Sequence, residues 1–208
     1  MNQKSIIQEV RSIMPTSTLH LLERPLTERE ARTVAERQAA KLLELLEISK
    51  PSVGIELVID LPEIEVEVVA DLPWSGHTTW QRGLWHVQIN ENDSLWRSRA
   101  TLAHELKHIL DDPFREQLYP GWSRDGSTQP PAMAERVSDY FAGCVLVPTP
   151  WLHRAWQLGI RSPAKLATLF DVSTRLIEVR IRQAGLSKAE KPTKLLGYMR
   201  QAAQPIAA

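Results

Sequence analysis

The chain has little cysteine and no excess of charge of either sign. Cys144 is the single cysteine among 208 residues, so no internal disulfide can form and the core must hold the fold unaided. A lone thiol is typical of a reducing compartment. Lysine and arginine together number 25, and so do aspartate and glutamate, so no overall field draws the chain toward nucleic acid or an anionic membrane.

Long apolar runs are missing as well. No stretch approaches the roughly 18 residues that a membrane-spanning helix needs. The first residues, MNQKSIIQEVRSIMP, carry Glu9 and Arg11 where a signal peptide would be apolar. We therefore expect a cytoplasmic protein that makes no membrane contact.

The first half of the chain contains one strong helix signal and two strand signals. The letters TERE form a capping box, in which Thr27 and Glu30 satisfy each other's helix-start amides, and an apolar stripe follows. Residues 64–69 and 84–90 alternate in polarity as strands do, and Arg82-Gly83 suits a hairpin turn. The sequence therefore predicts an α+β fold with a small, mostly antiparallel sheet packed on helices.

The helix expected at residues 95–110, after the capping residue Ser94, contains the letters HELKH. His104 and His108 are four residues apart, so both imidazoles lie on one helix face and can bind one ion. Glu105 lies about 100° round the helix, where it can reach a water on that ion and act as a general base. Because the pattern HExxH arises by chance in roughly one chain of this length in two hundred, the prediction needs a third ligand.

That ligand must come from another segment. Asp111 and Asp112 lie too far along the same helix, and Phe114 occupies the position of a third metzincin histidine. The helix expected at residues 132–146, AMAERVSDYFAGCVL, offers Glu135 and Asp139 one turn apart. One carboxylate can bind the ion while the other accepts a bond from a histidine's second nitrogen. The spacing alone does not assign the two roles, and an ordinary salt-bridged surface would show the same pattern.

The succession WSGHTTWQRGLWHVQIN, SLWRSRATLAHELKHIL and AERVSDYFAGCVLVP resembles the ImmA/IrrE family of metallopeptidases over about residues 30–186. The resemblance implies that His104 and His108 bind Zn²⁺, that Glu105 is the catalytic base and that Glu135 is the third ligand. Asp139 then becomes the candidate partner of a zinc-binding histidine. The chain departs from the family at Lys107, where glycine is frequent, and at VLVP, where LLMP is usual.

With this resemblance the chain divides into four expected parts. These are an N-terminal helical appendage at 1–26, a zincin-like metallopeptidase domain at 27–150, a helix-turn-helix-like segment completing the domain at 151–186, and a C-terminal tail at 187–208.

The helix-turn-helix-like segment has Ala167, Phe170, Val172 and Ile177 as packing positions and Ser173 as a cap. Three arginines, Arg175, Arg180 and Arg182, could face phosphates, but a few basic residues are commonly a solvated face. We therefore expect a protein partner more than DNA.

The leading interpretation is a zinc endopeptidase, and the resemblance implies a helix-turn-helix transcriptional repressor as its substrate. The alternative is a regulator that binds DNA or protein and contains zinc without catalysis. A strand bordering the cleft, such as residues 84–90, could hold an extended substrate. The residue that stabilises the oxyanion stays open among His77, His86, Tyr119 and His153.

Overall fold

A computed structural model of the chain describes residues 5–14, 24–122 and 130–186. The expected tail at 187–208 and part of the expected N-terminal appendage lie outside these residues. The helices and strands in chain order are α1 (Ile6–Arg11), α3 (Glu28–Leu45), the 3₁₀ helix η1 (Ile55–Asp60), β1 (Ile64–Val69), β2 (Gly76–Gln81), β3 (Leu84–Asn90), α4 (Leu95–Asp111), η2 (Asp112–Phe114), α5 (Arg115–Leu118), α6 (Ala132–Leu146), α7 (Thr149–Gln157), α8 (Pro163–Phe170) and α9 (Thr174–Gln183).

The two best-marked helix starts lie where the sequence predicts them. The Thr27 hydroxyl accepts from the Glu30 amide at 3.4 Å, and the Glu30 carboxylate accepts from the Thr27 amide at 2.8 Å. The Ser94 hydroxyl accepts from the Arg97 amide at 3.3 Å and begins α4. These local bonds fix the ends of the helices that flank the site.

The sheet is small and mixed, with the strand order β1-β3-β2. As predicted, β2 and β3 form an antiparallel hairpin, and Arg82 and Gly83 both have positive φ, 52° and 85°. The other pairing, β1 with β3, is parallel, because residues 70–75 pass the end of β3 before β2 begins. The Asn90 side chain holds this crossing by donating to the carbonyl of Leu72 at 2.7 Å. The strand at 84–90 is therefore central, β1 and β2 are the two edges, and β2 is the edge strand that lines the cleft.

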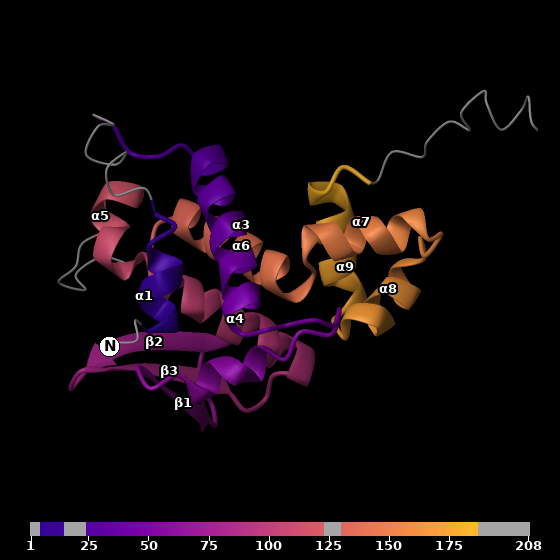
Figure 1. Cartoon of the computed structure of the whole chain (residues 1–208). Coiled ribbons are helices and arrows are strands. Elements are labelled where there is room, and N and C mark those ends of the chain that lie inside the picture. The colour runs from indigo at the N-terminus through magenta and orange to yellow at the C-terminus, as the bar shows by residue number, and fades with distance from the viewer. Residues whose placement is uncertain (1–4, 15–23, 123–129, 187–208) are drawn as a thin grey trace, which may run out of the picture.

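The helices pack above the sheet, which lies at the bottom of the view in Figure 1, and α7, α8 and α9 gather to one side. Helix α6 packs against both α3 and α4, and α4 contacts β2 and β3. Val10 and Met14, at the N-terminal helix, are buried in the same core. The α+β fold with a small sheet packed on helices is thus confirmed. Among the described residues, no helix combines the length and apolar character needed to span a membrane.

The C-terminal helices close against the rest of the fold through two buried arginines. The four expected packing residues of α8 and α9 are buried, and the Ser173 hydroxyl caps α9 by accepting from the Leu176 amide at 3.2 Å. Arg180, one of the three arginines that could face phosphates, is buried instead and donates to the Val147 carbonyl at 3.2 Å and the Thr149 hydroxyl at 2.9 Å.

The second buried arginine lies on α4. Arg99 donates to the backbone carbonyl of Asp171 at 2.6 Å and to its carboxylate at 2.8 Å. It also donates to the Val53 carbonyl and lies 3.0 Å from a carboxylate oxygen of Glu56. One guanidinium therefore joins the start of α4, the segment before η1 and the α8–α9 turn.

Candidate metal centre

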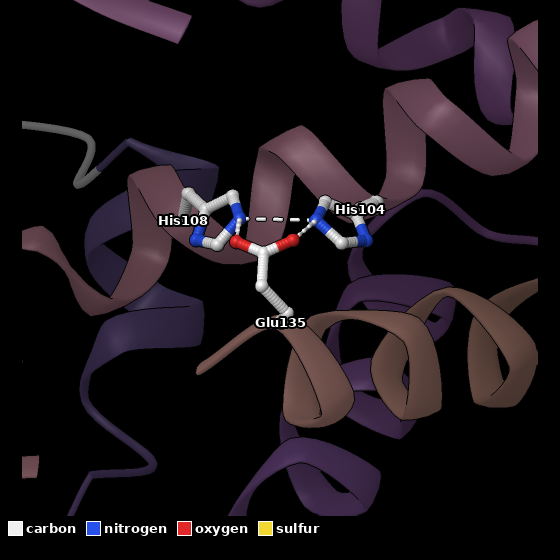
Figure 2. A group of neighbouring side chains, drawn as sticks. All are labelled: His104, His108 and Glu135. Atoms are coloured by element: carbon white, nitrogen blue, oxygen red, sulfur yellow. Dashed lines mark hydrogen bonds and ion pairs between the residues drawn. The ribbon is translucent and has the colours of Figure 1, made fainter. Parts of the chain in front are cut away.

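Two histidines from α4 and one glutamate from α6 converge at the floor of a cleft. The Nε2 atoms of His104 and His108 lie 3.0 Å apart. The Glu135 carboxylate lies against both imidazoles, 3.3 Å from His104 Nε2 and 3.4 Å from His108 Nε2 (Figure 2). The potential ligand atoms of the three residues all lie within 4.8 Å of one another.

The remaining imidazole nitrogens have partners on α6. His104 Nδ1 lies 2.9 Å from a carboxylate oxygen of Asp139, and His108 Nδ1 lies 3.5 Å from the Ser138 hydroxyl. A hydrogen donated from Nδ1 to such an acceptor leaves the Nε2 lone pair free for a ligand. The sequence identifies Asp139 in advance, whereas Ser138 has no local feature that distinguishes it from a core serine.

The histidines and carboxylates of this cluster shift one another's pKa values. Burial lowers the pKa of His104, but the carboxylates of Asp139 and Glu135 outweigh it and raise that pKa to about 9. The imidazoles of His104 and then His108 hold the pKa of Glu135 below its usual range. The same carboxylates would stabilise a cation bound at the Nε2 atoms, which would compete with protons for the imidazoles. Two imidazole nitrogens and one carboxylate form a donor set that fits zinc.

Glu105 lies beside this cluster without belonging to it. Its side chain is buried at 7% exposure, and its Oε2 atom accepts a 2.6 Å bond from the Thr78 hydroxyl on β2. Gly76, two residues earlier on β2, allows the close approach of strand and helix. A Cβ at that position would lie 2.3 Å from Thr101 Cγ2 and 3.1 Å from Glu105 Oε1. This contact between β2 and α4 forms only in the folded chain. The sequence therefore does not indicate that Thr78 and Gly76 lie beside Glu105.

A second polar cluster lies on a neighbouring face of α4. The Lys107 ammonium is buried and donates to the Gln38 side chain at 2.9 Å and to the Asp111 carboxylate. The Tyr119 hydroxyl donates to the same carboxylate at 2.7 Å. Lys107, which departs from the family pattern, is therefore accommodated by partners from α3 and from its own helix.

The three candidate ligands, His104, His108 and Glu135, form the metal cluster, and the cleft above them has a volume of about 1040 Å³. Its lining includes the metal cluster and Glu105, and side chains of β2 form one wall. Of the four residues weighed for the oxyanion, His77 lines the cleft, Tyr119 is buried under the helix, and His86 Nδ1 lies 3.1 Å from Glu65. His153 lies on α7, outside the lining.

Comparison with known proteins identifies a family and similar solved structures. A Mycobacterium tuberculosis transcriptional regulator has a TM-score of 0.47 and 16% sequence identity, and the match covers 91% of this chain and 53% of that chain. The chain therefore spans about half the length of that regulator. A comparison with curated proteins gave no match. The family model described as the IrrE N-terminal-like domain, a peptidase family, matches residues 69–182, over half of the chain. This range includes both metal-cluster helices, and the chain belongs to the IrrE N-terminal-like family of peptidases.

Proposed function

We propose that the chain is a zinc-dependent endopeptidase that cleaves a specific protein partner. The observation that carries this proposal is the convergence of His104, His108 and Glu135 in a cleft, with the separate carboxylate of Glu105 beside them. A structural zinc site commonly closes with four protein ligands, often cysteines, and needs no adjacent base. Three oxygen and nitrogen ligands with a neighbouring carboxylate suit catalysis better.

In this proposal His104, His108 and Glu135 hold the ion, and Asp139 fixes the tautomer and orientation of His104. Zinc, when bound, supplies Lewis acidity that polarises a peptide carbonyl and brings the pKa of a bound water toward neutrality. The remaining chemistry is proton transfer and positioning, which the side chains of the chain perform.

Glu105 is the general base. The Thr78 hydroxyl occupies its Oε2 atom, so Oε1 remains to take a proton from the attacking water. As the water oxygen bonds to the peptide carbon and the C–N bond breaks, Glu105 returns the proton to the leaving amine. The Thr78 bond keeps the carboxylate in one orientation through both transfers.

The open edge of β2 suits an extended substrate. The two-residue turn makes Gln81 and Leu84 the closing hydrogen-bonded pair, and the Trp85 amide donates away from β2, to the Glu63 carbonyl at 2.9 Å. By this alternation the backbone groups of Gly76, Thr78 and Trp80 point to the open edge. A peptide added there would run beside Glu105.

The proposed substrate is a helix-turn-helix transcriptional repressor, and this choice rests on the ImmA/IrrE resemblance. A peptidase with balanced charge needs contacts beyond the cleft to avoid cutting proteins at large. The exposed surface of α7, α8 and α9 is our candidate for such a contact.

The test compares the zinc-loaded chain with its Glu105→Gln variant on a repressor encoded beside it and on casein. We expect chelator-sensitive cleavage of the repressor at one or a few sites and little casein digestion. The variant should keep its zinc and lose about 100-fold or more in turnover, because it lacks the proton acceptor. Rapid, unselective casein digestion, or an intact repressor beside the zinc-loaded chain, would contradict the proposal.

The second candidate function is a non-catalytic zinc-containing regulator, which the helix-turn-helix-like pair α8–α9 favours. Arg175 and Arg182 are exposed on α9, but Arg180 is buried in the fold, so the basic face is smaller than the sequence suggests. Repressor binding that is equal in the wild type and in Glu105→Gln, without cleavage by either, would support this second function.

A further inference from the structure

We propose that Trp80 and Trp85 form a subsite that binds a bulky apolar or aromatic side chain of the substrate, within about two residues of the bond that is cut. The proposal rests on the peptidase function above and names the side-chain class that the cleft selects. It is argued from strand register, ring geometry and exposure.

The two indoles form one surface. Trp80 on β2 and Trp85 on β3 are directly opposite in the hairpin, so their side chains project to the same sheet face. Their ring centroids lie 4.9 Å apart at an interplanar angle of 55°. Trp85 packs against the core, whereas Trp80 is 55% exposed. Trp85 therefore supports Trp80 from behind, and Trp80 offers an unused apolar surface.

This surface lies in the active-site cleft. Trp80 and Trp85 line the same cleft as Glu105 and the two metal-cluster histidines. Thr78, whose hydroxyl binds Glu105, precedes Trp80 by two residues, so both side chains project to one face of β2, about 6.8 Å apart along the strand. Alternate side chains of an extended peptide repeat at the same spacing. A substrate paired to β2 with its scissile carbonyl near Glu105 would thus place a nearby side chain on Trp80.

The residues that line the cleft favour one class of substrate side chain. An indole face binds aromatic and large aliphatic groups well, and it can also bind a cation. Arg11 and Arg115 line the same cleft, and its three carboxylates already have partners: Asp112 lies 3.3 Å from Arg115, Glu135 lies against both imidazoles, and Glu105 accepts from Thr78. A lysine or arginine side chain would therefore approach two arginines and carboxylates that other groups already bind. Aromatic and large aliphatic side chains are therefore preferred over basic ones.

Trp96 provides a matched control because it is almost equally exposed, at 51%, but does not line the cleft. Its Nε1 atom donates to the Asp171 carboxylate at 3.1 Å. Trp96→Leu thus removes an exposed indole elsewhere. Trp80→Thr removes the proposed surface while keeping a residue that favours strands, and Trp80→Phe retains a smaller aromatic face.

The experiment uses four pools of labelled, end-capped hexapeptides that are random except for one fixed central residue: Phe, Leu, Ala or Lys. Binding to the zinc-loaded Glu105→Gln protein is measured by fluorescence anisotropy, and cleavage by the wild type is followed by mass spectrometry. We expect the Phe pool to bind about 10-fold more tightly than the Ala pool, with Leu between them and Lys no better than Ala. Trp80→Thr, made in the Glu105→Gln background, should reduce the Phe preference to about 2-fold or less, Trp80→Phe should restore part of it, and Trp96→Leu should leave it unchanged.

The outcomes separate the subsite from the peptidase. Equal binding of all pools, a preference for Lys, or a Phe preference that survives Trp80→Thr would each overturn the subsite. Phe-selective binding without cleavage of any pool or of the repressor would keep the subsite and count against the peptidase. Cleavage of all pools without a preference for Phe would support the peptidase and count against the subsite.

Discussion

Helix α4 carries two clusters of polar side chains on neighbouring faces, and they differ in whether a lysine or arginine of the chain pairs with their carboxylate. Under the helix and out of contact with water, the Lys107 ammonium donates to Gln38 and to the Asp111 carboxylate, and the Tyr119 hydroxyl donates to the same carboxylate. In the cleft, the Nε2 atoms of His104 and His108 face each other and a carboxylate at 3.0 to 3.4 Å. The first cluster balances its own charge, whereas the second needs a proton or a cation.

The difference shows that residue type alone does not identify a functional group. Lys107 and Asp111 are rarer as buried residues than His104 and His108, and a list of buried charges would select them first. Lys107 and Asp111 pair their charges with each other, and Lys107 also binds Gln38, so they stabilise the packing of α4 against α3. The histidine cluster, whose carboxylate faces imidazoles instead, is the one available for chemistry.

The largest expected effect tests whether the cleft cluster needs a cation. The wild type should bind about one zinc per chain, and His104→Ala or His108→Ala should lower the affinity by on the order of 1,000-fold or more, because each variant loses one of three ligands. Zinc would be measured by metal analysis and by competition with a chromophoric chelator. If both variants kept all their zinc, the histidine cluster would not be the zinc site, and the proposed difference between the two clusters would be wrong.

The buried cluster of Lys107, Asp111 and Tyr119 should affect the stability of the fold instead of zinc binding. Lys107→Met leaves the Asp111 carboxylate buried without its cation, so we expect the free energy of unfolding to fall by about 3 to 5 kcal/mol. Urea unfolding with chelator present would measure it. The double variant Lys107→Met with Asp111→Asn should recover part of the loss, since an amide can still accept from Tyr119. A zinc stoichiometry per folded chain that fell with Lys107→Met would show that the two clusters are not independent.

The two carboxylates of α6 provide a finer test within the cleft cluster. Glu135→Ala should weaken zinc binding as much as the loss of either histidine, and Asp139→Asn should weaken it by only about 10- to 100-fold, the usual cost of losing a ligand's partner. Both affinities would come from the chelator competition. If the severities were reversed, Asp139 would be the ligand and Glu135 its support.

The smallest expected effect concerns how β2 positions Glu105. Thr78→Val removes one hydrogen bond to a carboxylate, and we expect kcat to fall about 10-fold with KM nearly unchanged. Thr78→Ser keeps the hydroxyl and should restore most of kcat, whereas a loss of β2 packing would affect both variants. Unchanged kcat in Thr78→Val would show that Glu105 needs no support from the strand.

Local sequence patterns were sufficient to predict the helices that carry the site. The caps at Thr27 and Ser94 are hydrogen bonds between residues three apart, and the apolar stripe of α6 is a spacing that can be seen within one segment. Each of the three helices lies where its pattern predicts. The i, i+4 spacing brings His104 and His108 together, and Glu135 joins them as the resemblance implies. Their roles as ligands stay predictions.

Features that depend on distant packing could not be predicted in this way. The parallel β1–β3 pairing depends on the path of residues 70–75, which has no periodicity of its own. Thr78 reaches Glu105 only because β2 lies against α4. In the sequence Arg180 resembles a basic surface residue. In the fold its aliphatic stem lies against Gly143, where a Cβ would be only 2.8 Å from Arg180 Cδ.

The buried link at Arg99 bears on the order in which the chain matures. A ribosome releases Arg99 well before Asp171, so during synthesis the guanidinium first lacks the partner that accepts two of its hydrogen bonds. The start of α4 gains its final neighbours only when the α8–α9 turn has emerged and folded back. The start of this helix therefore cannot make these two bonds until the chain extends to Asp171.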